Sequence, residues 1–391
     1  MRKLLRKHPY FFLTAIFVGV VLRLLFVIKF PDISDDSLVY GEIAKNWLQH
    51  GIYGLTGNGG IYSTYIRLPG YPAFLAIIFG IFGIDHYRAV LVTQMLLDIG
   101  TCFFTADLAR RIHSNLAARV AFALTAVCPF LANYAAAALS ETLEIFFTVL
   151  ALDLAIAGAQ NRNLKSILFC GLSIGGTILI RPDGGILLIS TAACFAIWAM
   201  RGIMAKFRER PPADLYAGFS LRAAVLVTAI SLVVLIPWTV RNWVTMHRFQ
   251  PLAPRYANED DEFVSLGFNR WVKTWMAEYV SVEEIYWNVP GGKIDATLLP
   301  SRAFDSLAQK ERTFNLFRTY NSTLDIGPKL DRQFTDLAAE RIHAHPLRYY
   351  MVLPLARIAD MWLRPRTEIM PADPRWWEFN DEWKGSALAI G

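Results

Sequence analysis

Several apolar runs of about 20 residues constrain this chain more than any other feature of its sequence. The first extends from about Tyr10 to Phe30 and follows four basic residues, Arg2, Lys3, Arg6 and Lys7. A helix of that length crosses about 30 Å of hydrocarbon, whereas a signal peptide has a shorter apolar core and a small-residue cleavage site. We therefore predict an uncleaved first spanning helix with its N-terminus in the cytoplasm.

The composition supports a membrane protein. Hydrophobic residues make up 54% of the 391, and only 18% are charged, against about 25% in an average soluble domain. The formal charge of +6 does not indicate a nucleic-acid partner, because the basic residues cluster beside the apolar runs, as topology determinants do. The cysteines lie in apolar runs without Cys-x-x-Cys spacing and are predicted to be packing residues: Cys102, Cys128, Cys170 and Cys194.

The basic loops predict how the chain crosses the membrane. The run from Tyr71 to Ile84 has only about 14 residues, so we place it at the outer interface, which leaves Arg110 and Arg111 in the cytoplasm. Further spans are predicted near residues 89–109, 118–134, 141–159, 167–180, 186–200 and 221–238. The predicted fold class is an all-α polytopic membrane protein with about seven transmembrane helices and a long first outer loop with juxtamembrane helices.

Two regions follow from this topology. Residues 1–242 form the predicted transmembrane module, with a first outer loop at about 31–88. Residues 243–391 form a large mixed outer segment, rich in aromatic and charged residues and without a clear span. Its best apolar helix, about 347–363, carries Arg348, Arg357 and Asp360, so we predict that it lies in the membrane interface rather than across it.

An acidic stretch directly follows the first span. Asp35 and Asp36 begin a predicted helix from about Ser34, with Tyr40 on the same face as Asp36. Carboxylates there stabilise the positive end of a helix by about 0.3–1 kcal/mol, which is sufficient reason for their presence. The alternative is a base that accepts a proton from an attacking hydroxyl, or a cation site, at the outer membrane face.

The second motif, residues 65–72, contains Arg67 and Tyr71 in a bend set by two prolines and a glycine. Arg67 is predicted at the interface, where it either reaches lipid headgroups or binds a phosphate. Ser140 and Glu141 cap the helix that follows, or join Asp36 in one site.

Two more arginines are predicted at the outer interface. Arg181 lies in a tight turn and Arg241 in Pro237-Trp238-Thr239-Val240-Arg241-Asn242, and each either anchors to headgroups or binds a diphosphate or phosphodiester. Asp98 and Asp153 lie inside spans, where acids are costly and often functional. Metal-ligand spacing is absent from the sequence and no cofactor is predicted, with a divalent cation at the clustered aspartates as an open alternative.

Together these motifs resemble the C superfamily of glycosyltransferases, in particular the bacterial branch similar to protein O-mannosyltransferases and lipid A aminoarabinose transferases. The matching segments are Asp36-x-x-x-Tyr40-x-x-x-Ala44, Arg67-Leu68-Pro69-Gly70-Tyr71-Pro72, Ser140-Glu141, Arg181-Pro182 and the segment from Pro237 to Asn242. The resemblance implies a multi-pass protein of the bacterial inner membrane, with its active site on the outer face. It also implies a shared module of seven spans.

The implied reaction moves a sugar from a polyprenyl-phosphate donor to a hydroxyl on a lipid, glycan or protein acceptor. By the resemblance Asp36 occupies the position of the catalytic carboxylate, with Asp35 as the adjacent competitor, and inversion is expected. Substrate binding is expected from Tyr40, Arg67, Tyr71, Glu141, Arg181 and Arg241. The alternative function is a transporter or lipid-handling membrane protein, with Asp98 and Asp153 along its path.

The sequence departs from the family near its end. Members usually continue into several more spans, whereas this chain stops at Gly391 as another apolar run begins. We therefore expect a shortened member of the family, either truncated or minimal.

Overall fold

The computed structural model describes residues 1–33, 35–207, 213–259 and 262–364, and the chain divides into two compact units, Met1–Glu259 and Asp260–Gly391. The helix predicted from about Ser34 begins at Asp36, with Asp35 at its N-cap position, and Ser34 lies outside the described residues. The apolar run predicted near residue 391 also lies outside them.

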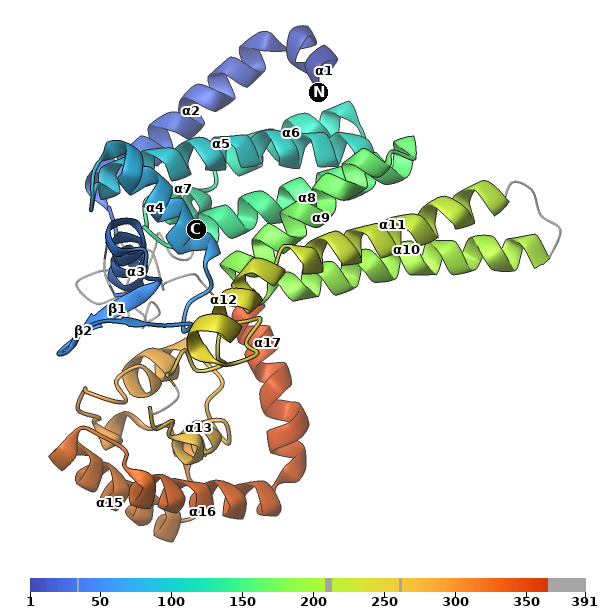
Figure 1. The fold of residues 1–391 in the computed structure, drawn as a ribbon. Coiled ribbons are helices and arrows are strands. Elements are labelled where there is room, and N and C mark those ends of the chain that lie inside the picture. Colours follow the sequence, from blue (N-terminus) through green and yellow to red (C-terminus); the bar gives the residue numbers. More distant parts are fainter. Residues whose placement is uncertain (34, 208–212, 260–261, 365–391) are drawn as a thin grey trace. The chain divides into compact units, whose positions relative to one another are not determined.

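The first unit is built almost entirely of helices (Figure 1). In chain order they are α1 (Arg2–Lys7), α2 (Pro9–Lys29), α3 (Asp36–His50), α4 (Gly70–Phe82), α5 (Tyr87–Ile112), α6 (Asn115–Ala126), α7 (Pro129–Ala135), α8 (Glu141–Asn161), α9 (Leu164–Ile180), α10 (Gly184–Phe207), α11 (Ala213–Val233) and α12 (Ile236–Met246). A two-stranded antiparallel hairpin, β1 (Gly54–Gly57) and β2 (Gly60–Ser63), follows α3. The prediction of an all-α polytopic membrane protein is confirmed.

Five helices in the described residues are long and apolar enough to cross a membrane: Pro9–Lys29, Tyr87–Ile112, Glu141–Asn161, Gly184–Met204 and Ala217–Met246. A sixth span results if α6 and α7, which meet at a bend of 54°, are counted together. The remaining predicted span, near residues 167–180, corresponds to α9, which has 17 residues and is apolar but shorter than the others. The predicted short helix is α4, with 13 residues.

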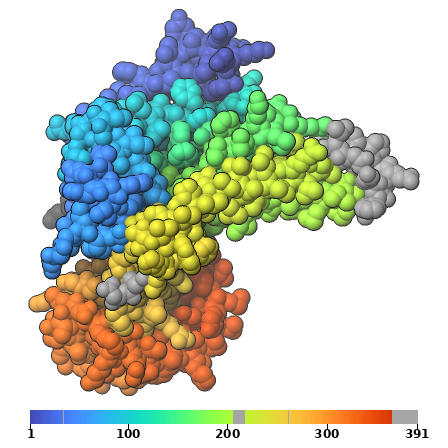
Figure 2. Space-filling model, viewed as in Figure 1, coloured from blue at the N-terminus to red at the C-terminus, as the bar shows by residue number. Residues whose placement is uncertain are grey.

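The long helices expose the surface expected of lipid-facing segments. On α2, side chains such as Leu13, Phe17 and Val21 are exposed although they are apolar. Helices α10 and α11 pack along one another as a hairpin (Figures 1 and 2). Many of their apolar side chains, such as Ile186, Ile189 and Val225, are exposed. In a protein without a membrane such surfaces would favour aggregation, so they indicate contact with hydrocarbon.

One apolar cluster holds together the helices that later form the candidate site. It contains Ala44 of α3, Tyr71 and Leu75 of α4, Leu143 of α8 and Ile180 of α9, together with Ile78, Phe79 and Val90. Two glycines allow the close approach: a Cβ at Gly41 would lie 1.8 Å from the Tyr87 hydroxyl oxygen, and one at Gly70 would lie 2.7 Å from the carbonyl oxygen of Leu179. Side chains at these positions would separate α3 from α5 and α4 from α9.

A buried arginine organises the bend between α6 and α7. Arg23 of α2 is fully buried, and its Nε donates to Asp98 Oδ2 of α5 at 2.6 Å. Its Nη atoms donate to the carbonyl oxygens of Ala126 at 2.6 Å and Thr125 at 3.2 Å. These carbonyls belong to the C-terminal end of α6, and that of Thr125 also accepts from the amide of Cys128 at 3.4 Å. Arg23 therefore supplies additional donors to the end of the helix, directly before the break at Pro129.

The second unit has its own core. Its elements are α13 (Leu266–Val272), α14 (Tyr279–Ser281), η1 (Val282–Tyr286), η2 (Ala296–Leu298), η3 (Ser301–Ala303), α15 (Leu307–Thr323), α16 (Pro328–Ala344), η4 (Arg348–Val352) and α17 (Leu353–Leu363). Phe268 and Trp271 of α13 pack against Phe317 of α15 and Phe334 of α16. The predicted boundary at residue 242 falls inside α12, which belongs to the first unit.

Replacing Arg23 by methionine should lower stability by about 3–5 kcal/mol, because Asp98 and the α6 carbonyls would then lack a partner inside the membrane. The measurement is the apparent Tm of the detergent-solubilised protein. Leu13→Ala, at a 63% exposed position of the same helix, is the control and should leave Tm nearly unchanged. The double variant Arg23→Met/Asp98→Leu should recover part of the loss. An unchanged Tm in Arg23→Met would contradict this account.

Candidate functional site

The start of α3 is tied to the start of α8 through the backbone. The amide of Asp32 donates to the carbonyl of Ala136 at 3.0 Å, and the amide of Ala138 donates to the carbonyl of Asp32 at 2.9 Å. This short parallel bridge joins the segment before α3 to the segment that connects α7 with α8. It brings the predicted acidic stretch close to Ser140 and Glu141, which are far away in sequence.

Asp36 and Arg67 form an ion pair. The Oδ1 atom of Asp36 lies 2.6 Å from Nη2 of Arg67, which comes from the segment between β2 and α4. The Asp36 side chain is 55% exposed, whereas that of Arg67 is 19% exposed. The Nε atom of Arg67 is buried and has no hydrogen-bond partner among the described residues. Arg67 is therefore held from one side by Asp36 and keeps an unused donor.

Asp35 lies in a different environment from Asp36. It occupies the N-cap position of α3, and its side chain makes no capping hydrogen bond. Its φ of 42° is in the left-handed region, which aspartate tolerates better than most residues. The two neighbouring carboxylates are thus distinguished by geometry, since Asp36 pairs with the arginine and Asp35 sits at an exposed turn.

Tyr40 packs against both Tyr71 and the arginine of the Asp36–Arg67 pair. Its ring packs edge-on against that of Tyr71 with centroids 5.0 Å apart, and the Arg67 guanidinium carbon lies 5.8 Å from its centroid. Burial raises the pKa of Tyr40, an effect that Arg67 opposes and that Asp36 and Glu141 reinforce. Its hydroxyl thus stays protonated at neutral pH and can donate a hydrogen bond to a ligand.

Tyr71 is enclosed rather than open to a ligand. Its hydroxyl donates to Gln94 Oε1 at 2.7 Å, and Gln94 Nε2 donates to the carbonyl of Ala137 at 2.7 Å. Both side chains are fully buried. This chain of hydrogen bonds links α4 and α5 to the backbone segment that pairs with Asp32, so Tyr71 acts on the site through the position of Tyr40.

Arg181 forms ion pairs with three carboxylates. Its Nη1 lies 2.8 Å from Glu141 Oε1, its Nε 3.2 Å from Glu144 Oε2, and its Nη2 3.4 Å from Asp183 Oδ2. Burial by itself would lower the pKa of Arg181, but the surrounding carboxylates raise it above its ordinary value. The guanidinium is therefore charged at all physiological pH values and already neutralised by its neighbours.

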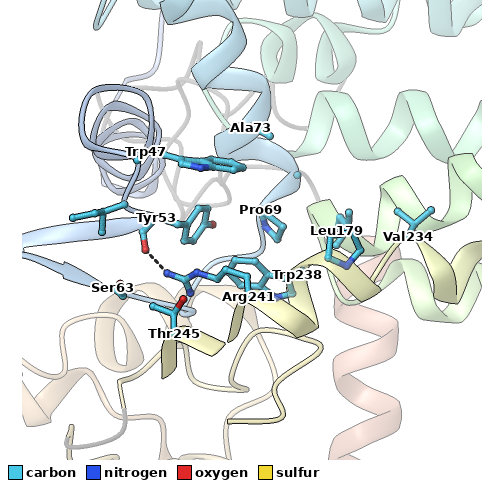
Figure 3. A pocket seen from close by; sticks show the side chains of 14 residues that line it. Trp47, Tyr53, Ser63, Pro69, Ala73, Leu179, Val234, Trp238, Arg241 and Thr245 are labelled. Atoms are coloured by element: carbon cyan, nitrogen blue, oxygen red, sulfur yellow. Dashed lines mark hydrogen bonds between the residues drawn. The ribbon is translucent and has the colours of Figure 1, made fainter. Parts of the chain in front are cut away.

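Arg241 lines a cavity of about 490 Å³. Its Nη1 donates to the carbonyl of Thr64 at 2.7 Å and to Asn242 Oδ1 at 2.9 Å, and its Nη2 donates to the carbonyl of Tyr53 at 2.6 Å (Figure 3). The guanidinium also stacks over the rings of Tyr53 and Trp238, at 5.2 and 5.3 Å. These hydrogen-bond acceptors are neutral, and the Glu259 carboxylate interacts electrostatically with the guanidinium.

The rest of the cavity wall is mostly apolar. Figure 3 shows Trp47, Pro69, Leu179 and Val234 around the space that Arg241 borders. The Nε1 atom of Trp238 is buried and has no hydrogen-bond partner among the described residues. A ligand that fits this wall has an apolar body and an acceptor or anionic end.

Tyr53 joins this cavity to the ion pair. Its hydroxyl donates to the carbonyl of Arg67 at 2.9 Å, while its own carbonyl accepts from Arg241. The structure therefore brings Asp36, Tyr40 and Arg67 together with Glu141 and Arg181, and it positions Arg241 in the neighbouring cavity. Sequence reasoning did not single out Tyr53 or Gln94, because neither residue lies in a recognisable motif and their contacts are long-range.

The donor set does not fit a metal ion. Asp36 is paired with Arg67, and Glu141 and Glu144 are paired with Arg181. In the part of the chain that the structure describes, no three His, Cys, Asp or Glu side chains gather in a metal-binding group. The carboxylates of this site are arranged around guanidinium groups instead.

Replacing Tyr71 by phenylalanine should cost about 1–3 kcal/mol of stability, because Gln94 Oε1 would lose its buried donor. We expect a lower apparent Tm in detergent. Tyr10→Phe is the control, since the Tyr10 side chain is 84% exposed and should tolerate the change. Equal Tm values for the two variants would show that the buried hydrogen-bond chain does not matter.

Comparison with known proteins shows a family to which part of the chain is similar. No curated protein matches the chain. A family model described as dolichyl-phosphate-mannose-protein mannosyltransferase matches residues 67–240, which begin at the arginine of the ion pair. Asp36 lies before the matched segment and Arg241 directly after it. The predicted resemblance is confirmed over this segment: the chain is a polytopic membrane protein similar to the dolichyl-phosphate-mannose-protein mannosyltransferases.

Proposed function

We propose that this protein is a membrane glycosyltransferase that moves a sugar from a polyprenyl-phosphate donor to an acceptor hydroxyl. The observation that carries the proposal is the Asp36–Arg67 pair, which joins an exposed carboxylate to a partly buried guanidinium. Similarity to dolichyl-phosphate-mannose-protein mannosyltransferases over residues 67–240 supports the same reaction class. The acceptor is a lipid, a glycan or a protein, and the reaction takes place on the outer face of the bacterial inner membrane.

Asp36 is the proposed general base. The attacking hydroxyl gives its proton to the Asp36 carboxylate while its oxygen forms a bond to the anomeric carbon. The bond from that carbon to the phosphate oxygen breaks, and its electron pair leaves with the polyprenyl phosphate. A phosphate monoester is a good leaving group and needs little protonation. Attack from the opposite side of the carbon inverts its configuration.

The phosphate requires a cation whose charge is available. Glu141, Glu144 and Asp183 already neutralise Arg181, so it serves to order the start of α8. Arg241 is held by neutral acceptors beside an apolar wall, which suits a phosphate attached to a prenyl chain. Arg67 is the second candidate, because its Nε is unused and binding a phosphate would free Asp36 to accept a proton.

The alternative of a transporter has less support. It placed Asp98 and Asp153 along a transport path. Asp98 is instead paired with Arg23 at 2.6 Å, and Asp153 with Arg111 at 2.7 Å. Both aspartates thus have a structural role in holding helices together.

Asp36→Asn should reduce sugar transfer about 100-fold or more, because the amide cannot accept the proton. Transfer is measured with a radiolabelled polyprenyl-phosphate sugar and cell-envelope extract. Asp35→Asn is the matched control: the neighbouring exposed carboxylate is removed, and activity should stay within a few fold of the parent. Both variants should insert into the membrane normally. Near-normal transfer by Asp36→Asn would eliminate Asp36 as the base.

Arg241→Gln should raise the KM for the donor about 10-fold or more, since a charge-assisted phosphate contact is worth roughly 1.5–3 kcal/mol. Saturation kinetics with increasing donor provide the measurement. Lys45→Gln removes a cation of the same region that pairs with Asp85 at 3.7 Å and does not line the cavity, so its KM should not change. The same KM in Arg241→Gln as in the parent would remove Arg241 from the phosphate site.

A further inference from the structure

The last helical segment of the second unit carries an apolar stripe on its open side. Leu347, Met351, Leu355, Ile358 and Trp362 follow one another at helical spacing of three or four residues. Their exposed fractions are 68%, 57%, 62%, 51% and 76%. Helix η4 leads directly into α17, so the stripe lies along one continuous helical segment about 24 Å long.

The arginines of the same segment are bound to groups of the second unit. Arg348 binds both carboxylate oxygens of Asp305, at 2.7 and 2.8 Å. Arg357 donates to the carbonyls of Met276 at 2.9 Å and Lys273 at 2.6 Å. The inner face of the segment is therefore fastened to its own unit by polar contacts.

The charged residues at the C-terminal end of α17 also have partners. Arg364 lies 3.2 Å from Asp360, and its guanidinium carbon is 4.2 Å from the centre of the Tyr279 ring. Leu353, on the inner face, is buried. Each charged side chain of residues 347–364 thus has a partner in the described structure.

We propose that this stripe lies in the interfacial layer of the membrane that the first unit spans, with lipid acyl chains as its partner. The last candidate span ends at Met246, and the described part of the second unit begins at Glu262. The roughly 16 residues between them reach about 60 Å at most, which limits how far the start of the second unit can lie from the end of that span. A bilayer is consequently the apolar partner that is always within reach.

The side chains fit this partner. Tyr350 and Trp362, exposed by 65% and 76%, are of the type that concentrates at membrane interfaces, where one part of the ring is apolar and one part is polar. Because the arginines of the segment already have partners, attachment relies on apolar burial rather than on anionic headgroups. The stripe therefore requires no anionic lipid, and high salt does not release it.

Site-directed spin labelling of the full chain in proteoliposomes tests this placement. Single cysteines replace Leu355, Ile358 or Trp362 in a background where the four native cysteines are alanine. The matched control is Leu307→Cys, because Leu307 begins α15 and is 80% exposed. Collisions of each label with oxygen, which dissolves in lipid, and with a water-soluble nickel chelate are compared in zwitterionic vesicles, with and without high salt.

We expect the three stripe labels to collide several-fold more with oxygen, and several-fold less with the nickel chelate, than the label at position 307. The pattern should persist in high salt. Nickel accessibility equal to that at position 307 would mean that the stripe faces water and would overturn the proposal. Protection from both reagents would also overturn it, because protein would then cover the stripe. The measurement uses no sugar transfer, so its outcome is independent of the proposed reaction.

Discussion

The buried contact of Arg23 with Asp98 and with the end of α6 holds α2, α5 and α6 together, just before the segment that leads to the candidate site. A charged side chain inside a membrane is tolerated only when its charge and its donors are satisfied. Here the Arg23 guanidinium donates to the Asp98 carboxylate and to carbonyls at the end of α6, where the chain bends into α7. That bend directs the chain into the segment that pairs with Asp32, immediately before α3.

The three arginines of the site differ in how far neighbouring carboxylates neutralise their charge. Arg181 is surrounded by three carboxylates and stabilises the start of α8. Arg67 pairs with one exposed carboxylate, that of Asp36, and its Nε donor remains unused. Arg241 donates its hydrogen bonds to neutral groups on the wall of a mostly apolar cavity, and Glu259 is the carboxylate that acts on it electrostatically. The three guanidinium groups look alike in sequence, and only their acceptors distinguish them.

Much of the fold was predictable because lipid imposes simple requirements on length and polarity. The run from Tyr10 to Phe30 corresponds closely to α2, and the short run from Tyr71 corresponds to α4. The bend after Ala126 was missed, since the predicted span near 118–134 was treated as one helix. Pro129, which has no amide hydrogen and stands first in α7, marks the break in the sequence. The contact of Arg23 with the end of α6, about a hundred residues away, is visible only in the structure.

Most residues of the candidate site were predicted from the sequence, but the contacts between them were not. The sequence by itself determined the helical class, because only long helices satisfy the backbone of such apolar runs in hydrocarbon, and it identified Asp36, Arg67 and Arg241 as chemically suitable residues. Only the tertiary structure decided that Asp36 rather than Asp35 pairs with Arg67, that Tyr71 is buried against Gln94, and that Tyr53 lies between the ion pair and the cavity. These outcomes depend on which distant backbone and side-chain groups meet, and hydrogen bonds and ion pairs act only over a few ångströms.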